Sequence, residues 1–410
     1  MENNKVIPQL RFPGFEGDWE KKKFMDITFP AGKKNSQNLP YERYSISNEV
    51  GFYPQSDQFE DGGGYLKDID CRQYIVVPPK SFAYNPARIN VGSIGYQDLG
   101  KEVIVSSLYE VFRTSDACYD PFLWQWFHTD VFHRMVVNVQ EGGVRQYFFY
   151  EKLKECSIRL PSFSEQKKIA DLLTTVDDII SIQEQKVETL KAHKKGLMQQ
   201  LFPQPGETTP PLRFPGFSSE WVEVTIGDVF NLRNGYTPSK SEESFWSDGK
   251  LAWFRMDDIR EKGHILYDSA QHITESAVKG NKLFEANTII VATSATIGEH
   301  ALIRVKHLAN QRFVNLSIKD SYLSKTNIEY AYQFMFIVDE ICKSKVNVGA
   351  FASISTEVFS GLPYLMPSLE EQRVITGCLS AIDDVIDLEE KKAKSLKQLK
   401  KGLVQNLFPL

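Results

Sequence analysis

Arginine, asparagine and glutamine recur in the polar segments that separate the apolar runs of this sequence. Arginine can pair with guanine, and asparagine or glutamine with adenine, through two hydrogen bonds in the major groove of DNA. Together with nearby glycines and hydroxyl residues, they predict loops that contact bases. A single such residue more often stabilises a turn or faces water, so the prediction concerns the set. The candidates are Asn85, Arg88, Asn90, Arg145, Gln146 and Tyr147 in the first half of the chain, and Thr237, Ser239, Lys240, Thr293, Ser294, Asn310, Gln311 and Arg312 in the second.

Motifs that would carry catalysis are missing from the sequence. There is no G-x-x-x-x-G-K-[ST] phosphate loop, no G-x-S-x-G turn and no glycine-rich cofactor loop between a strand and a helix. Asn85-Pro-Ala-Arg88 lacks the second proline and the aromatic residue of the N-P-P-aromatic motif of amino-methyltransferases. The five cysteines show no C-x-x-C spacing, so we expect free thiols, no metal site and no cofactor in this chain.

The elements that must position the polar loops are short strands and a few helices. Apolar runs at Tyr74–Pro78, Glu102–Ser106 and Thr288–Ala292 are bounded by Gly, Asn, Asp and Pro turns, which is typical of strands. Aromatic stretches at Phe122–Met135 and Ile328–Ile341 favour helices. Both polar regions are therefore expected to lie in mixed, β-rich globular segments.

The two halves of the chain repeat one another. LRFPGF occurs at residues 10–15 and again at 212–217, and Trp19 and Trp221 share its offset of 202. A charged segment from Ser162 matches one from Ser368 at an offset of 206, and GSIG at 92–95 resembles ATIG at 295–298. The chain is therefore a tandem duplication of a variable segment followed by a charged one.

Each charged segment is typical of a long helix. Ser162-x-x-Glu165 and Ser368-x-x-Glu371 are capping boxes, in which the serine and the glutamate satisfy amides of the first turn. With about 38 residues, each helix would be roughly 57 Å long and would need a partner, which the other copy supplies as an antiparallel coiled coil. The predicted seam follows a heptad pattern and contains Leu173, Val176, Ile180, Val187, Leu190, Leu197, Leu379, Ile382, Ile386, Leu396 and Leu403.

An antiparallel coiled coil also explains the unchanged hexapeptide. Both copies would lie where a helix end meets the start of a globular segment, with Phe12, Phe15 and Trp19 packed against the helix end. The coiled coil would then separate the two variable segments at a set distance. The fold class is α+β: two mixed β-rich domains, 1–160 and 205–366, and two spacer helices, 161–204 and 367–410, related by an internal pseudo-two-fold repeat.

Composition sets limits on the partners. The formal net charge is -5, and in none of the four segments do basic residues outnumber acidic ones, so DNA contact would depend on local clusters or on a partner. No apolar run reaches membrane-span length, and MENNKVIPQL lacks the pattern of a signal peptide. We expect a cytoplasmic protein.

The organisation resembles the specificity subunit of bacterial type I restriction-modification systems. The resemblance rests on two divergent segments, two helices that open P-S-x-x-E-Q and end L-F-P, and R-F-P-G-F at both junctions. It implies two target recognition domains, each reading half of a bipartite site in double-stranded DNA, and a coiled-coil spacer. It also implies two methyltransferase subunits that carry S-adenosylmethionine, and optionally two restriction subunits with motor and nuclease activity.

Two other functions are weighed against this one. A coiled-coil adaptor would recruit proteins without binding DNA, and salt-dependent binding to duplex DNA separates it from a DNA reader. A single-chain methyltransferase would need the missing cofactor loop, and cofactor crosslinking to the isolated chain tests for one.

Overall fold

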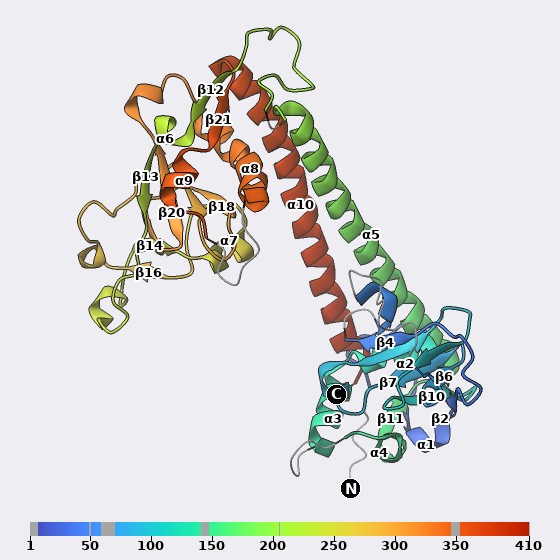
Figure 1. Cartoon of the computed structure of the whole chain (residues 1–410). Helices are drawn as coiled ribbons and strands as arrows, with labels where there is room; N and C mark the ends of the chain where they lie inside the picture. Colours follow the sequence, from blue (N-terminus) through green and yellow to red (C-terminus); the bar gives the residue numbers. More distant parts are fainter. Residues whose placement is uncertain are drawn as a thin grey trace. The chain divides into compact units, whose positions relative to one another are not determined.

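The computed structural model describes residues 7–48, 51–58, 70–140, 147–204, 206–345 and 353–409. The chain divides into two compact units, Met1–Gln185 with Glu390–Leu410 and Lys186–Glu389 (Figure 1). Each unit contains one globular part and a portion of each of the long helices α5 (Phe163–Leu201) and α10 (Leu369–Leu407). Both helices have 39 residues, close to the length predicted from the heptad pattern.

In the described residues of the first unit, the globular part consists of short strands and the helices α1 to α4. The largest sheet has the order β2-β10-β7-β8, from β2 (Thr28–Pro30), β10 (Glu110–Thr114), β7 (Ser81–Tyr84) and β8 (Ile94–Gln97). The smaller sheets contain β3 (Lys33–Lys34), β6 (Ile75–Val77) and β9 (Val103–Val105), then β4 (Tyr44–Ser47) with β5 (Gly51–Pro54), and β1 (Glu20–Lys23) with β11 (Ser157–Leu160). The helices are α1 (Phe24–Ile27), α2 (Asp120–Phe127), α3 (Asp130–Gln140) and α4 (Tyr150–Glu155).

The globular part of the second unit follows the same plan. Its largest sheet has the order β13-β20-β17-β18-β15, from β13 (Phe230–Asn234), β20 (Phe313–Ile318), β17 (Thr288–Ala292), β18 (His300–Ile303) and β15 (Ile265–Leu266). The smaller sheets contain β16 (His272–Ile273), β14 (Leu251–Phe254) and β19 (His307–Ala309), and β12 (Val222–Thr225) with β21 (Pro363–Met366). The helices are α6 (Ile226–Val229), α7 (Met256–Lys262), α8 (Ile328–Lys345) and α9 (Thr356–Ser360).

The duplication is therefore visible in the topology. The order β2-β10-β7-β8 reappears as β13-β20-β17-β18. In the β1–β11 pair Glu20 lies opposite Leu160, and in the β12–β21 pair Val222 lies opposite Met366, so the registers also match. The α+β class and the two β-rich domains predicted from the sequence are confirmed.

One predicted helix differs in detail. The aromatic stretch at Phe122–Met135 forms two helices, because α2 ends at Phe127 and α3 starts at Asp130. The Thr129 hydroxyl accepts a hydrogen bond from the Phe132 amide at 3.2 Å, so this threonine acts as a helix N-cap inside the stretch. The stretch predicted at Ile328–Ile341 forms the single helix α8.

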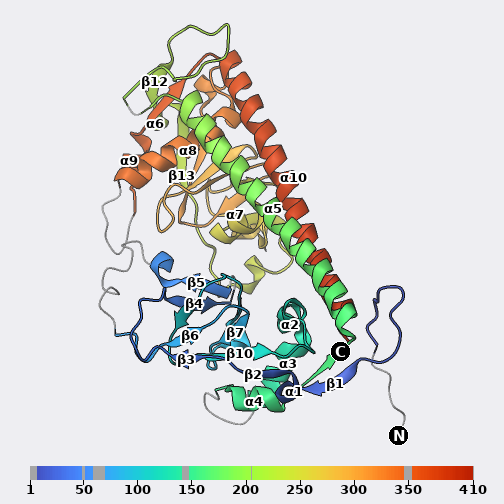
Figure 2. The same ribbon diagram turned by 90° about the vertical axis from the view of Figure 1, so that its right-hand side faces the viewer.

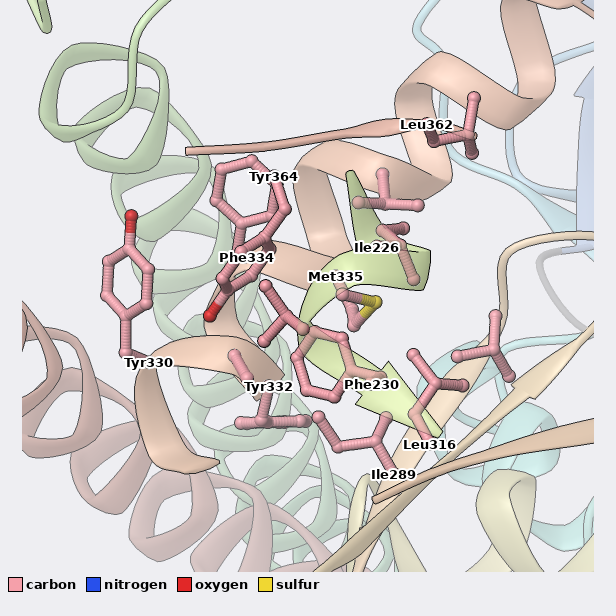
Figure 3. Packing of buried hydrophobic residues seen from close by; sticks show 14 of the residues in the cluster. Ile226, Phe230, Ile289, Leu316, Tyr330, Tyr332, Phe334, Met335, Leu362 and Tyr364 are labelled. Carbon is pink, nitrogen blue, oxygen red and sulfur yellow. The ribbon is translucent and has the colours of Figure 1, made fainter. Parts of the chain in front are cut away.

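Aromatic side chains dominate both cores. In the second unit Tyr330, Phe334 and Tyr364 pack with Phe230 (Figure 3). Phe202, just after α5, packs against Tyr330 and Phe334. In the first unit Phe408, just after α10, packs in the same way against Phe122 and Trp19. Each long helix thus ends inside the hydrophobic core of a globular part, which stabilises the attachment by burying aromatic surface.

Candidate nucleic-acid interface and helix junctions

Candidates from three loops meet at one end of the large sheet of the second unit. The Thr237 hydroxyl donates to Gln311 Oε1. The amide and the hydroxyl of Thr293 both donate to the Arg312 carbonyl, at 3.0 and 3.3 Å. Asn310 Oδ1 accepts the Arg312 amide at 2.9 Å. The structure therefore brings these residues together although they lie up to 75 positions apart in the chain.

The remaining candidates of this unit lie beside that group. Ser294 forms a β-bridge with Ser353 and is half-buried. Ser239 and Lys240 are exposed and follow Thr237 by two and three residues. The Trp246 indole donates to the Ser239 carbonyl at 2.9 Å, which fixes the turn that carries them.

Close backbone approach at Gly235 makes this arrangement possible. The backbone amide of Gly235 donates a hydrogen bond to the Phe313 carbonyl at 3.0 Å, and that of Tyr236 donates to the Ala309 carbonyl at 2.8 Å. A Cβ atom at residue 235 would lie 2.1 Å from the Ala309 carbonyl oxygen, so any other residue would force the loops apart. Sequence reasoning missed this glycine, and the signal that could have found it is the Asn234-Gly235 pair at the end of a strand.

In the first unit the candidates cluster on the loop between β7 and β8. Asn85 Oδ1 accepts the Ala87 amide at 3.0 Å, so this asparagine stabilises the turn. Arg88 is exposed and Asn90 is half-buried. The Phe148 amide donates to the Pro86 carbonyl at 3.0 Å, which brings the neighbouring Tyr147 to this loop. Arg145 and Gln146 lie outside the described residues.

The two loop regions occupy equivalent places in the duplicated fold. The β7–β8 loop, with Asn85, Arg88 and Asn90, corresponds to the β17–β18 loop, with Thr293 and Ser294. Each loop contains residues of the repeated tetrapeptide: Gly92 and Ser93 precede β8, and residues 295–298 lie within the β17–β18 loop. The first residue of each tetrapeptide has a left-handed backbone, with φ of 88° at Gly92 and 65° at Ala295.

Three basic side chains in these loop regions have no partner among the described residues. Within the described ranges, the exposed side chains of Arg88, Lys240 and Arg312 form no hydrogen bond or ion pair. Two further basic residues lie near the second loop region and were missed by sequence reasoning. Arg233 lies over the Phe284 ring at 4.6 Å, and Lys282 donates to the Asn234 carbonyl at 2.8 Å. Such donors can contact phosphates and base edges even though the net charge is negative.

Metal-binding clusters and titratable groups with shifted pKa values bear on what chemistry the described residues could perform. Among the described residues, no group of three or more His, Cys, Asp or Glu side chains could hold a metal ion. Burial raises the pKa of the Cys118 thiol to about 12 and lowers the pKa of His300 to about 3, so both side chains are neutral near pH 7. Across the described part of the chain, no helix is long and apolar enough to cross a membrane.

The repeated hexapeptide joins two helix ends in each unit. In the first unit the Leu10 amide donates to the Asn406 carbonyl near the end of α10, at 2.9 Å. Arg11 donates two hydrogen bonds, of 2.8 and 2.9 Å, to the carboxylate of Glu165 in the first turn of α5. The end of α10 therefore lies beside the N-terminal arm (Figure 2), as the antiparallel arrangement predicts.

The same junction recurs in the second unit. The Leu212 amide donates to the Gln200 carbonyl at 2.9 Å, and the Arg213 guanidinium donates two hydrogen bonds of 2.8 Å to the Glu371 carboxylate. The capping serines accept the predicted hydrogen bonds. The hydroxyl oxygens of Ser162 and Ser368 each accept a bond of 3.3 Å from the backbone amide three residues later. The glutamates of the capping boxes differ from the prediction, because their carboxylates bind the junction arginines. This contact explains why the arginine of the hexapeptide is repeated.

A glutamine in each long helix attaches it to the globular part of the same unit. Gln166 accepts the Tyr119 amide at 2.8 Å and donates to the Ala117 and Pro161 carbonyls. Gln372 accepts the Asn327 amide at 2.9 Å and donates to Lys325 and Pro367. The P-S-x-x-E-Q motif thus binds the start of α2 or α8 through its last residue.

Within each unit the two long helices pack as an antiparallel coiled coil. Six of the predicted seam residues are buried: Leu173, Val176, Ile180, Val187, Leu379 and Ile386. The other five are half-buried: Leu190, Leu197, Ile382, Leu396 and Leu403. Ion pairs flank the seam, from Lys186 to Glu389 in the second unit and from Lys397 to Glu184 in the first.

Comparison with known proteins agrees with the duplicated architecture. The family model described as the type I restriction modification DNA specificity domain matches residues 17–192 and again residues 218–398. The specificity subunit of the Escherichia coli type I restriction enzyme EcoprrI is 49% identical over 152 residues, which are 37% of each chain. That of the Methanocaldococcus jannaschii enzyme MjaVIII is 23% identical over 99% of this chain and 95% of its own.

Solved structures share the fold. A chain from a study of assembly and conformational transition of the type I R-M system has a TM-score of 0.61 at 15% identity, over 98% of this chain and 99% of its own. The S subunit of a type I restriction-modification system from M. genitalium has a TM-score of 0.57 at 16% identity, over 99% of this chain and 100% of its own. With two matched domains, two corresponding sheets and two equivalent helix junctions, the chain belongs to the type I restriction-modification DNA specificity family.

Proposed function

We propose that each globular part reads one half of a bipartite target in double-stranded DNA. The observation that carries this proposal is the equivalence of the β7–β8 and β17–β18 loops, which present uncommitted Arg88 in the first unit and lie beside Arg312 in the second. Two sheets of one topology with different loop residues are expected for two readers of different short sequences. Phosphate contacts would position each loop region, and base contacts would specify its half-site.

Single arginine variants test the assignment of half-sites. Arg88→Ala should relax discrimination in one half of the site and Arg312→Ala in the other, each by about tenfold or more at one base pair. Arg72, which is exposed but paired with Asp70, provides the matched control, and Arg72→Ala should leave both halves unchanged. Competition binding with single-base substitutions across the site measures this. Loss of the same half in both arginine variants contradicts the proposal.

We further propose that the coiled coil sets the gap between half-sites and binds two methyltransferase subunits. Ile179 and Ile182 are 46% and 66% exposed on α5, and Val385 and Leu388 are 43% and 52% exposed at the same offset of 206 on α10. Adjacent exposed apolar side chains on a helix are typical of protein contacts. Because the pair is present twice, a partner that binds one pair should also bind the other.

Aspartate substitutions on these pairs test the stoichiometry. Ile182→Asp and Leu388→Asp should each remove one methyltransferase subunit, and the double variant should remove both, as read by native mass spectrometry. Leu399 is 55% exposed on α10, but its counterpart at the same offset is His193, so Leu399→Asp is the control and should retain both subunits. Unchanged assembly of the double variant would exclude this docking surface.

The remaining chemistry would reside in the partners. We place S-adenosylmethionine and adenine methylation in the methyltransferase subunits, and cleavage in restriction subunits where these are present. The complex would work in the cytoplasm, where the DNA is. The isolated chain should transfer no methyl group, and activity should appear when the methyltransferase subunit is added.

The adaptor function is kept as the alternative. An adaptor would show no salt-dependent affinity for duplex DNA, whereas a reader that neutralises several phosphates should lose affinity steeply as salt rises. A titration with target and non-target duplexes at two salt concentrations separates these functions.

A further inference from the structure

A carboxylate in each unit joins three separate elements. In the second unit Asp383 of α10 accepts hydrogen bonds of 2.6 and 2.8 Å from Lys194 of α5 and one of 3.0 Å from Gln333 of α8. Figure 1 shows α8 alongside α10. In the first unit Asp177 of α5 binds Lys400 of α10 at 2.6 Å and Gln125 of α2 at 2.9 Å. We call each set of three residues a node.

The nodes are deeply buried on the side of the globular parts. Gln125 is 2% exposed and Gln333 is 1% exposed. The second amide atom, Oε1, has no hydrogen-bond partner within the described residues in either glutamine. A buried acceptor without a partner destabilises a fold, and an apolar residue of the same size would avoid that penalty. Glutamine nevertheless occupies this place in both units, where its amide nitrogen donates to a carboxylate of a long helix.

The nodes add directional hydrogen bonds to the apolar packing between each globular part and the long helices. Lys194 and Lys400 occupy heptad positions of the seam, where a polar residue specifies register at the expense of stability. Gln372 and Asp383 lie eleven residues apart on α10, about 16 Å along the helix axis, and Gln166 and Asp177 repeat this spacing on α5. One attachment point allows a globular part to pivot on the helix. A second point about three turns away fixes its angle.

We propose that the two nodes are positioning devices that fix the angle of each recognition domain on the coiled coil, and thereby restrict the gap lengths at which both half-sites are read. This inference rests on the proposed function of the two domains. Asp177, Asp383 and their glutamines are positioning residues, which act through the domains that carry the reading loops.

The two nodes differ in strength. Lys194 binds both oxygens of Asp383, and its ammonium lies 4.7 Å from the centre of the Phe336 ring. His128 occupies the place of Phe336 in the aligned helices, and the Lys400 and Asp177 side chains are more exposed than those of their counterparts, at 24% and 38% against 11% and 28%. The second domain should therefore be held more rigidly than the first.

The glutamines are the residues to change, because the aspartate then keeps its lysine. In the full chain assembled with its methyltransferase subunits, Gln333→Leu should bind the preferred gap about as well as the natural protein. Its discrimination against a gap one base pair longer or shorter should fall by about tenfold, the value of one hydrogen bond to a charged group. Gln125→Leu should have the smaller effect, and base discrimination inside each half-site should not change in either variant.

Gln97→Leu is the matched control. Gln97 is also fully buried, but it bonds the backbone at Val77, Leu99 and Lys101 within one domain. It should lower thermal stability without changing gap discrimination. Gap discrimination that stays intact in the Gln125→Leu/Gln333→Leu double variant overturns the proposal, as does a parallel loss of base discrimination, which would indicate general unfolding.

A measurement without DNA separates this inference from the proposed function. Nitroxides on a ketone-bearing unnatural amino acid at Lys240 and Glu188 report the angle of the second domain on the helices of its own unit and leave the five cysteines unlabelled. Gln333→Leu should broaden the distance distribution measured by double electron–electron resonance, and Gln97→Leu should not. An unchanged width contradicts the positioning role of the node even if the protein reads DNA. A broadened width in a protein that does not bind DNA contradicts only the proposed DNA-reading function.

Discussion

Arg11 and Glu165 are 154 residues apart in the chain, and their side chains form a bidentate ion pair at a helix junction. Arg213 and Glu371 form the same pair in the other unit. The bond to Glu165 raises the pKa of the Arg11 guanidinium above its usual value, and Glu371 does the same for Arg213. Each arm is thereby held to the first turn of a long helix.

Breaking one junction pair should destabilise its unit strongly. Glu371 is fully buried, so Arg213→Met would leave an unpaired buried charge and should lower the free energy of unfolding by about 3–5 kcal/mol. Arg72 and Asp70 form an equally bidentate pair on the surface, so Arg72→Met serves as the control and should destabilise the fold far less than Arg213→Met. Calorimetric unfolding measures both, and equal losses would contradict the assignment.

The left-handed residue in each of the β7–β8 and β17–β18 loops predicts opposite effects of two substitutions. Ala295→Gly should stabilise the second unit by about 1 kcal/mol, because glycine adopts a φ of 65° without steric strain. Gly92→Ala should destabilise the first unit by a similar amount, since φ is 88° there. Thermal unfolding of both variants tests this, and a destabilised Ala295→Gly protein would show that the methyl group makes a packing contact.

Acid should destabilise the second unit through its buried histidines. Burial lowers the pKa of His300 to about 3 and that of His307 to about 4, whereas an unfolded histidine titrates near about 6.5. The unfolded state therefore binds more protons below about pH 6.5, and stability present above that pH is lost towards pH 4, at up to about 1.4 kcal/mol per pH unit for each histidine. His300→Leu should reduce this slope in urea unfolding measured from pH 7 to 4.5. An unchanged slope in His300→Leu would contradict the prediction.

Lengthening the coiled coil should move the preferred gap. Insertion of one heptad after Glu188 and one after Lys394 keeps the seam and both nodes and lengthens the coil by about 10 Å. The preferred gap should grow by up to about 3 base pairs at about 3.4 Å each. Affinity at the new optimum should be lower, because added base pairs also rotate one half-site around the duplex. Binding to sites that differ in gap length measures the optimum, and an optimum at the original gap with full affinity would show that the helices do not set the distance.

Local patterns in the chain were sufficient to predict the duplication, the long helices and the heptad seam. Helices of this length are specified by period and capping residues, so Ser162 and Ser368 predicted their starts without tertiary information. Asn310, Gln311, Arg312 and Thr293 were chosen by residue type alone, and their side-chain chemistry is a property of the sequence.

Tertiary structure decided which distant residues meet. Glu165 binds Arg11 rather than a helix amide. Gly235 lets the end of a strand approach Ala309. Asp383 accepts hydrogen bonds from both Lys194 and Gln333. Such contacts depend on the packing of β-strands and helices that are far apart in the chain, for which a single sequence has no periodic signal. The buried glutamines show this most clearly, since an isolated glutamine in an aromatic helix looks like a surface residue until the partner helix is placed beside it.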